Sequence, residues 1–336
     1  MIRVVHLGLG EIGKRTIEVL LAQHPAVKLV GVVDVNPMLI GQPLRRIMAG
    51  RTGNVPALNV AGTLHEALRN ARADAATMTT GSRTVDVRGT VEELIAAGIH
   101  VVSTCEELAF PQLRAAGIAA ALDKKARRAG VVVLGTGVNP GFAMDAFALA
   151  CTAPCRLVRS IRVLRSLDAR KRRVQLQKKV GAGMSVAEVR ALIRRNAIGH
   201  VGLGESVAMI AAGLGWKLDA IKEHFSPVVA TAPVASAFYR VQAGQVRGMR
   251  MTAAGLVDGK KKIELDLTMA LGAETYDEVR IDAGGGDPPL VVRTTTGFHG
   301  DTSTVAILVN CVRAVAGLEP GVRTMLDLLR VRSVGA

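Results

Sequence analysis

The stretch VVHLGLGEIGKR at residues 4–15 sets the strongest limit on how this chain can fold. It places a glycine-rich turn between an apolar run and a helical pattern, and a second apolar run follows that ends at Asp34. In such a turn Gly8 makes the bend, Gly10 lets the backbone approach a pyrophosphate, and Gly13 allows the helix to pack closely on the strand. The helix N-terminus supplies unpaired N–H groups for that phosphate. The pattern predicts a βαβ unit that binds a dinucleotide.

Asp34 indicates which dinucleotide the turn accepts. At the end of the second strand it is placed to accept a hydrogen bond from a ribose 2′-hydroxyl, and its charge disfavours a 2′-phosphate. Lys14 and Arg15 lie close in sequence and leave NADP open. We therefore expect NAD(P) as the cofactor, with NAD favoured.

The alternation of apolar runs and helical patterns continues through the first half of the chain. Strand-like runs at 75–80, 100–104 and 130–134 are separated by helical patterns near 85–97 and 113–128. This alternation is typical of successive βαβ units. It predicts an α/β fold with a doubly wound parallel sheet in the N-terminal domain.

Three segments follow those strands: TTGS at residues 79–82, STCEELAF at 103–110 and GTGVNPG at 135–141. Because open parallel sheets bind ligands at the carboxyl ends of their strands, we expect these segments to share one rim. Small residues with free backbone groups suit contacts with a nicotinamide ribose and amide. The predicted cofactor-binding residues are Gly8, Gly10, Glu11, Ile12, Gly13, Asp34, Thr79, Thr80, Gly81, Ser103, Thr104, Cys105, Asn139 and Gly141.

The sequence pattern changes in the second half of the chain. Residues 263–271 alternate apolar and polar side chains, as in a half-buried strand, and Asp258-Gly259 before them is a hairpin signal. Ser185-Val-Ala-Glu188 is a capping box, and a last helix is predicted from Asp301 to Ala316. We expect a second, α+β domain with a largely antiparallel sheet. The predicted parts are a dinucleotide-binding domain at 1–148, the second domain at 149–300, and a C-terminal helical segment at 301–336 that packs back on the first domain.

The composition excludes several classes of protein. Hydrophobic residues make up 49% of the chain and charged residues 21%, which is ordinary for a soluble globular protein. No apolar run resembles a membrane span, and the N-terminus enters strand-like sequence at once, so we expect a cytoplasmic protein without a membrane partner. The four cysteines and seven histidines show no disulfide or metal-ligand spacing, so we expect no metal.

The formal net charge of +15 raises the question of a nucleic-acid partner. The densest basic cluster is Arg170-Lys-Arg-Arg173, followed by Lys178-Lys179. Aromatic residues make up only 3% of the chain, so stacking platforms for single strands are scarce. We expect no nucleic-acid partner and interpret the charge as a solvated basic surface that helps to attract an anionic cofactor.

Several ordered motifs carry a resemblance to a known family. They are STCEEL at 103–108, LGTGVNPGF at 134–142, KRRVQLQKKVG at 171–181, IGHVGL at 198–203, ESVAMI at 205–210 and GFHGDTS at 297–303. Through nearly its whole length the chain resembles the 2,4-diaminopentanoate dehydrogenases and the related native amine dehydrogenases, a branch of the dihydrodipicolinate reductase-like oxidoreductases. The resemblance implies a Rossmann domain, a second domain for substrate binding and dimerisation, and NAD(P)-linked interconversion of an amine with a ketone plus ammonia. It implies a homodimer.

Glu106 and Glu107 stand where a strand of the parallel sheet ends. By pattern alone, either glutamate suits the first turn of the following helix, where acid favours the helix dipole. The resemblance favours catalysis, because reductive amination needs proton transfers that a carboxylate can perform as general acid and base. Partial burial would raise the pKa of that carboxyl. Since neighbours on an extended segment point opposite ways, we expect Glu106 to be catalytic, with Glu107 as the alternative and helix capping left to the other.

The substrate contacts that the resemblance implies each have a structural alternative. Arg165 and His200 are positions that could hold a polar or carboxylate end of the substrate, but Arg165 could be a surface residue and His200 a core or loop histidine. Asn139, Phe142 and Met144 would line the wall beside the nicotinamide, or serve only as packing residues.

Two other functions are compatible with the same fold. One is an ammonia-independent NAD(P)H reductase of the dihydrodipicolinate reductase or homoserine dehydrogenase type, for which a basic residue or a His-rich motif is expected in place of Glu106-Glu107. The other is a non-catalytic NAD-binding redox sensor, which predicts salt-sensitive binding to nucleic acid and no turnover.

Overall fold

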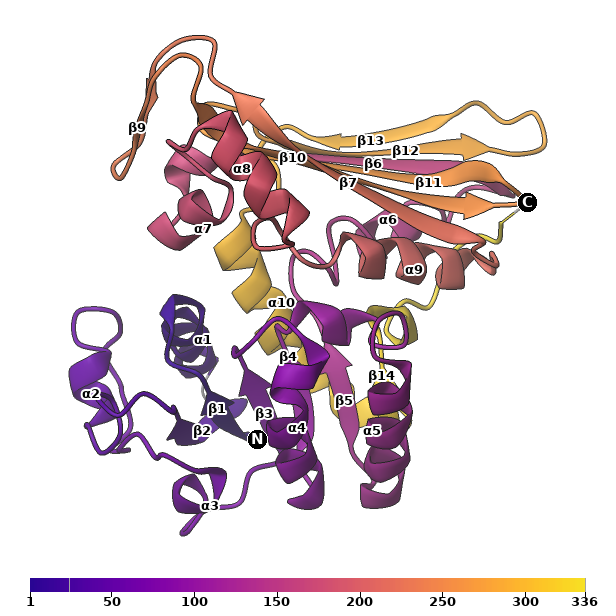
Figure 1. Ribbon diagram of the computed structural model, residues 1–336. Helices are drawn as coiled ribbons and strands as arrows, with labels where there is room; N and C mark the ends of the chain where they lie inside the picture. The colour runs from indigo at the N-terminus through magenta and orange to yellow at the C-terminus, as the bar shows by residue number, and fades with distance from the viewer. Residues whose placement is uncertain (24, 336) are drawn as a thin grey trace. The chain divides into compact units, whose positions relative to one another are not determined.

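The computed structural model describes residues 1–23 and 25–335 of the chain. It contains two compact units (Figure 1). The first unit comprises Met1–Phe142 and His299–Arg330, and the second comprises Ala143–Phe298 together with the residues from Val331 onward. The domain boundaries predicted from sequence were at residues 148 and 300. The expected C-terminal segment, 301–336, is divided between the two units.

The first unit is built on a six-stranded sheet in the order β14-β5-β4-β3-β1-β2. All neighbouring strands in it run parallel, which confirms the predicted doubly wound sheet. Its strands are β1 (Ile2–Leu7), β2 (Val27–Val33), β3 (Ala75–Met78), β4 (His100–Ser103), β5 (Val132–Gly135) and β14 (Gly321–Arg323). The chain order reverses between β1 and β3, and such a reversal is where sheets of this kind bind ligands.

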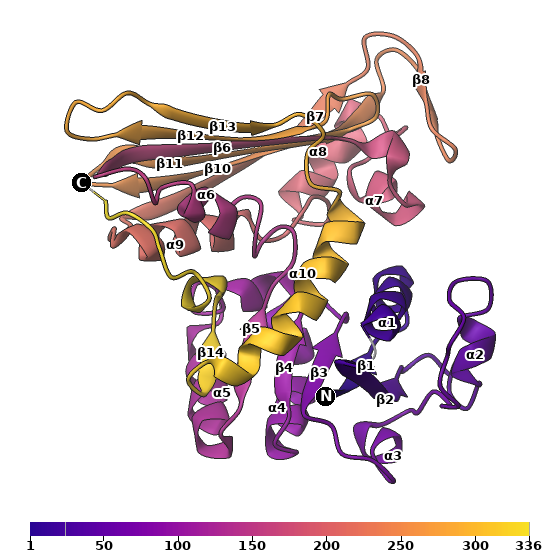
Figure 2. The same ribbon diagram turned by 180° about the vertical axis from the view of Figure 1, so that it is seen from behind.

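Helices cover both faces of this sheet. They are α1 (Glu11–Ala22), α2 (Leu44–Ile47), α3 (Leu64–Ala67), α4 (Thr84–Ala96), α5 (Ala116–Ala129) and α10 (Gly300–Ala314), with short 3₁₀ turns at η1 (Glu106–Ala109), η3 (Val315–Gly317) and η4 (Met325–Asp327). Val4 and Val102 pack in one apolar core with α1 and α10, whereas their neighbours Val5 and Val101 pack in a second core with α4 and α5. Successive residues of these strands therefore point to opposite faces of the sheet and pack in two separate apolar cores. Figure 2 shows α10 lying along the sheet on the side of α1.

The second unit is built on a six-stranded mixed sheet in the order β13-β12-β6-β11-β10-β7. Within this sheet only the pair β6 and β11 is parallel, which confirms the prediction of a largely antiparallel sheet. Its strands are β6 (Val158–Asp168), β7 (Ala220–Val229), β10 (Val246–Val257), β11 (Lys260–Ala270), β12 (Tyr276–Ala283) and β13 (Leu290–Thr294), and a separate small hairpin pairs β8 (Val234–Ala235) with β9 (Arg240–Val241).

Two local sequence signals of this unit are confirmed. Asp258 and Gly259 both adopt positive φ and join β10 to β11, as a tight hairpin turn requires. Ser185 and Glu188 form the predicted capping box. The helical elements are α6 (Ala146–Ala150), η2 (Ala169–Lys171), α7 (Val174–Lys179), α8 (Val186–Arg194) and α9 (Leu203–Leu214). The nearly all-apolar α9 packs against β7, β10 and β11, so one face of the sheet is buried (Figure 1).

Candidate active site

The glycine turn after β1 has the geometry of a phosphate-binding loop. Gly8 adopts φ +95°, which bends the chain out of the strand. Gly10 stands at the N-cap position of α1, and because it has no side chain, no side-chain hydrogen bond caps the helix. A Cβ placed on Gly10 would meet no atom within 4 Å. A Cβ on Gly13 would lie 1.8 Å from the Gly8 carbonyl oxygen. The backbone at the N-terminus of α1 is thus accessible from outside, and this accessibility suits a bound pyrophosphate.

Asp34 lies at the end of β2, beside this turn. Its Oδ2 accepts a hydrogen bond from the N–H of Leu9 at 2.5 Å, and its Oδ1 accepts one from the N–H of Asn36 at 2.8 Å. The carboxylate therefore ties the glycine turn to the end of β2. Arg15 donates to Glu11 at 3.1 Å, so its guanidinium is paired along α1.

The segments after β3 and β4 lie at the same carboxyl edge of the sheet. Thr79 donates its hydroxyl to the Gly8 carbonyl at 3.0 Å, which links the β3 segment to the glycine turn. Ser103 is fully buried, and its Oγ accepts from the N–H of Cys105 at 3.1 Å. Burial raises the pKa of the Cys105 thiol to about 12. Of the predicted cofactor residues here, Ser103 and Cys105 are buried, and their mutual hydrogen bond stabilises the turn that follows β4.

The structure distinguishes the two glutamates after β4. Glu107 donates its backbone N–H to the carbonyl of Ser82 at 3.2 Å, and its Oε2 accepts from the backbone N–H of Thr84 at 2.8 Å. Thr84 is the first residue of α4, so the Glu107 carboxylate caps the N-terminus of that helix. The prediction of an extended segment here with alternating side chains was wrong. Glu106 begins a 3₁₀ turn, in which successive side chains are separated by a third of a turn.

The loop after β5 completes this edge of the first unit. A Cβ on Gly135 would lie 2.1 Å from the backbone of Leu108, so glycine lets β5 end directly against the 3₁₀ turn. Asn139 is buried and precedes Pro140 through a cis peptide bond, and Gly141 adopts φ +122°. The rim of the first unit therefore contains Glu106 and Asn139 on adjacent strand ends, β4 and β5.

Three of the predicted substrate residues belong to the second unit, namely Arg165, His200 and Met144, whereas Phe142 ends the first. Arg165 is only 3% exposed, so the alternative of a surface arginine was wrong. Its guanidinium donates to Asp277 at 2.5 Å and to the carbonyl of Phe298 at 2.7 Å. Asp277 was not predicted from sequence, because no sequence signal links a residue of β12 to one of β6.

Met144 and His200 differ in burial. Met144 is fully buried. His200 is half-buried in the turn before α9, and its backbone N–H faces the sulfur of Met251 at 3.2 Å.

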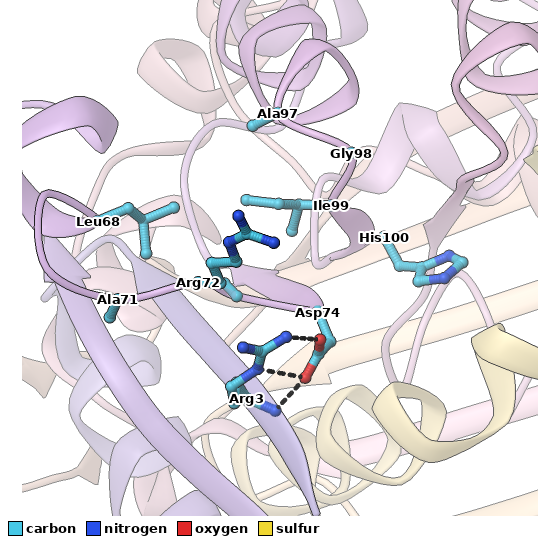
Figure 3. A pocket seen from close by; sticks show the side chains of 10 residues that line it. Arg3, Leu68, Ala71, Arg72, Asp74, Ala97, Gly98, Ile99 and His100 are labelled. Atoms are coloured by element: carbon cyan, nitrogen blue, oxygen red, sulfur yellow. Dashed lines mark hydrogen bonds and ion pairs between the residues drawn. The ribbon is translucent and has the colours of Figure 1, made fainter.

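A cavity of about 520 Å³ lies at the opposite, amino edge of the first sheet (Figure 3). Arg3, Arg72, Asp74 and His100 are among the residues that line it. Arg3 and Asp74 form a two-point ion pair, with Nε to Oδ2 at 3.0 Å. Because no predicted site residue lines this cavity and parallel sheets bind ligands at their carboxyl edge, it is separate from the dinucleotide rim.

The part of the chain that the structure describes contains no group of three or more His, Cys, Asp and Glu side chains that could hold a metal ion. In the same residues, no helix is long and apolar enough to cross a membrane.

Comparison with known proteins identifies relatives of the whole chain. Residues 142–335 match the model of the 2,4-diaminopentanoate dehydrogenase C-terminal domain. A curated 2,4-diaminopentanoate dehydrogenase from Acetoanaerobium sticklandii is 31% identical over 99% of this chain and 95% of its own length. An amine dehydrogenase structure from Mycobacterium smegmatis has a TM-score of 0.82 at 22% identity and covers 98% of this chain and 97% of its own. GenD2 from gentamicin A biosynthesis, solved with NAD, has a TM-score of 0.58 at 20% identity, with coverages of 98% and 90%.

Proposed function

Because this chain belongs to the 2,4-diaminopentanoate dehydrogenase family, we propose that it is an NAD(P)-dependent amine dehydrogenase acting on a CH–NH₂ group. In this reaction an amine is oxidised to a ketone plus ammonia, and the reverse reaction is the reductive amination of a ketone. The observation that supports the catalytic assignment is the hydrogen bond from Thr84 to Glu107. It gives Glu107 a structural role and favours Glu106 as the catalytic carboxylate.

The first unit supplies the residues that would hold the cofactor. The uncapped N-terminus of α1 and the open space over Gly10 suit a pyrophosphate, and the GenD2 structure with bound NAD shares the fold. When bound, the nicotinamide exchanges a hydride with the carbon that carries the nitrogen. Asp34 supports NAD over NADP, because a 2′-phosphate beside its carboxylate would meet like charge.

Glu106 would move the protons of the reaction. In the direction of amine formation, ammonia adds to the ketone carbon, and the nitrogen loses a proton to the carboxylate. The carboxyl group passes that proton to the oxygen, which gives a neutral carbinolamine. A second proton, taken up from solvent through the same carboxyl group, then lets the hydroxyl depart as water and leave an iminium ion. The carboxylate, again ionised, stabilises this cation until hydride transfer reduces it to the amine. Glu106 is half-buried at the strand end, a position from which such an exchange with a small ligand is possible.

The remaining predicted site residues are those expected to bind the substrate. We propose that Asn139, Phe142, Met144 and His200 contact the substrate. The guanidinium of Arg165 donates to Asp277 and to the carbonyl of Phe298. We therefore propose that Arg165 fixes the backbone at Phe298 and does not contact the substrate. The partners are a small amine or ketone and ammonia, and the active form would be a homodimer.

The experiment that tests this function is NADH oxidation by the purified protein with a panel of ketones and keto acids, including 2-amino-4-oxopentanoate. Each substrate is assayed with and without a high concentration of ammonium at alkaline pH, and the Glu106→Gln variant is assayed beside the wild type. Turnover that needs ammonium and is lost in the variant is expected. Turnover without ammonium would instead favour a reductase of the dihydrodipicolinate reductase type, and tight NADH binding without any turnover would favour a sensor.

The preference for NAD has its own test. Asp34→Asn keeps an oxygen that can accept from Leu9 but removes the charge. We expect the ratio of kcat/KM for NADH over NADPH to fall in this variant, mainly through a lower KM for NADPH. A wild-type enzyme that uses NADPH better than NADH would contradict the assignment.

A further inference from the structure

His6 lies directly beneath the glycine turn, in a position that the proposed function does not use. It is the penultimate residue of β1, fully buried, and paired in register with Thr77 of β3. Its Nδ1 lies 2.8 Å from the Thr77 hydroxyl, and its Nε2 lies 2.8 Å from the carbonyl oxygen of Gly8. An imidazole in the middle of an apolar sheet is costly to bury unless both nitrogens are bonded, and here both are.

These contacts fix the protonation state of the ring. A carbonyl oxygen can only accept, so Nε2 of His6 must carry the proton that it donates to Gly8. In the neutral ring Nδ1 is then an acceptor, and the Thr77 hydroxyl donates to it. Burial also lowers the pKa of His6 to about 4, so the ring is neutral at ordinary pH. The Gly8 carbonyl therefore fixes the tautomer of His6, and the Thr77 hydroxyl satisfies the other ring nitrogen.

The bond to Gly8 is one of three that converge on a single peptide unit. The oxygen of the Gly8–Leu9 peptide accepts from His6 and from the Thr79 hydroxyl, and the N–H of the same peptide donates to Asp34. These three side chains come from the ends of three adjacent strands, β1, β3 and β2. The plane of this peptide is held at both its oxygen and its N–H, and the chain continues from it to Gly10.

We propose that His6 is a positioning residue for the cofactor, which orients the Gly8–Leu9 peptide so that the N–H groups at the start of α1 face the pyrophosphate. The inference rests on the dinucleotide site of the proposed function but not on its amine chemistry. Without the His6 bond, the peptide plane could rotate about the flexible Gly8, and the phosphate-facing N–H groups would no longer be pre-oriented. Cofactor affinity, rather than the chemical step, would then be lost.

The test is direct NADH binding, followed by fluorescence, for two substitutions of His6. His6→Leu removes both hydrogen bonds, and we expect the Kd for NADH to rise about ten-fold or more, as for other buried bonds left unmade. His6→Gln places an amide nitrogen near the position of Nε2, and we expect it to restore binding to within about three-fold of wild type. At saturating NADH, kcat should change less than two-fold in both variants.

His100→Leu is the matched control. His100 begins β4 in the same sheet, and its Nδ1 accepts from the backbone N–H of Val132 at 3.0 Å, but it lies at the amino edge. A general loss of stability should lower the Tm of both leucine variants, whereas only His6→Leu should weaken NADH binding. Equal Kd values for His6→Leu and wild type would overturn the proposal, as would equal weakening in His100→Leu.

A second substitution covers the case in which His6→Leu does not fold. Thr77→Val keeps the shape of Thr77 but removes the hydroxyl that bonds Nδ1 and holds the His6 ring in place, and we expect a rise in the Kd for NADH of about three-fold. An unchanged Kd in this variant would overturn the proposal. Because binding is measured without turnover, a failure of the amine dehydrogenase assignment leaves this result readable.

Discussion

Replacing Glu107 should cost stability and leave catalysis almost intact. Its carboxylate makes one hydrogen bond of 2.8 Å to the first amide of α4, in a half-buried position. Glu107→Ala leaves that amide without its acceptor, and the loss of a helix cap costs about 1–2 kcal/mol. Glu107→Gln keeps an oxygen but removes the charge at the positive end of the helix, which costs about 0.5–1 kcal/mol. In a domain of 150–250 residues, 1 kcal/mol lowers Tm by about 2–4 °C.

The assay compares three variants by thermal unfolding and by steady-state kinetics. We expect Tm to decrease in the order wild type, Glu107→Gln, Glu107→Ala, with kcat/KM in both Glu107 variants within about three-fold of wild type. Glu106→Gln should instead lose a factor of about 10² or more in kcat, the usual contribution of a general acid and base.

The opposite distribution of effects would refute this reasoning. If Glu107→Gln abolished turnover while its Tm stayed at the wild-type value, the bond to Thr84 would be incidental and Glu107 would be the catalytic residue. Double replacement of both glutamates gives a further check. If the roles are separate, the loss of Tm and the loss of kcat should each equal that of the corresponding single variant.

Three further outcomes are expected. Gly10→Ala should leave Tm unchanged and weaken NADH binding, whereas Gly13→Ala should lower Tm by several degrees, because only the second Cβ meets the protein, at 1.8 Å from a carbonyl oxygen. Arg165→Ala should destabilise the fold by about 3–5 kcal/mol in urea unfolding, since it leaves the carboxylate of Asp277 buried and unpaired. Burial lowers the pKa of His6 to about 4, so between pH 6.5 and 4 the unfolded chain binds more protons than the folded one. The free energy of unfolding should therefore fall as the pH decreases through this range. His6→Gln should flatten that dependence.

The parts of the fold that were predictable from sequence are those with a local physical signal. The period of two in β11, the Asp258-Gly259 turn and the Ser185 capping box each depend on residues a few positions apart. The strand β14 was missed, because Gly321-Val-Arg323 is too short to show a period. Its place in the sheet comes from pairing with β5, which lies far away in sequence.

In the candidate site, too, only the features with a local sequence signal were predictable. The glycine turn was recognisable because its function depends on the spacing of three glycines in one short segment. The choice between Glu106 and Glu107 depended on Thr84, the first residue of the preceding helix, and no sequence pattern connects the two. The position of Arg165 depended on Asp277 in the same way, and the alternation of β6 did not reveal that a charged residue lies on its buried face.

The return of the chain to the first unit has a consequence for how the protein is made. Side chains of α10, among them Val305 and Leu308, share a core with Val4 and Leu20, and β14 supplies an edge strand. A nascent chain therefore cannot complete this core until α10 and β14 have left the ribosome. The mixed sheet of the second unit is encoded by one continuous stretch, which ends before α10 begins. During synthesis this mixed sheet can therefore form before the core of the first unit is complete.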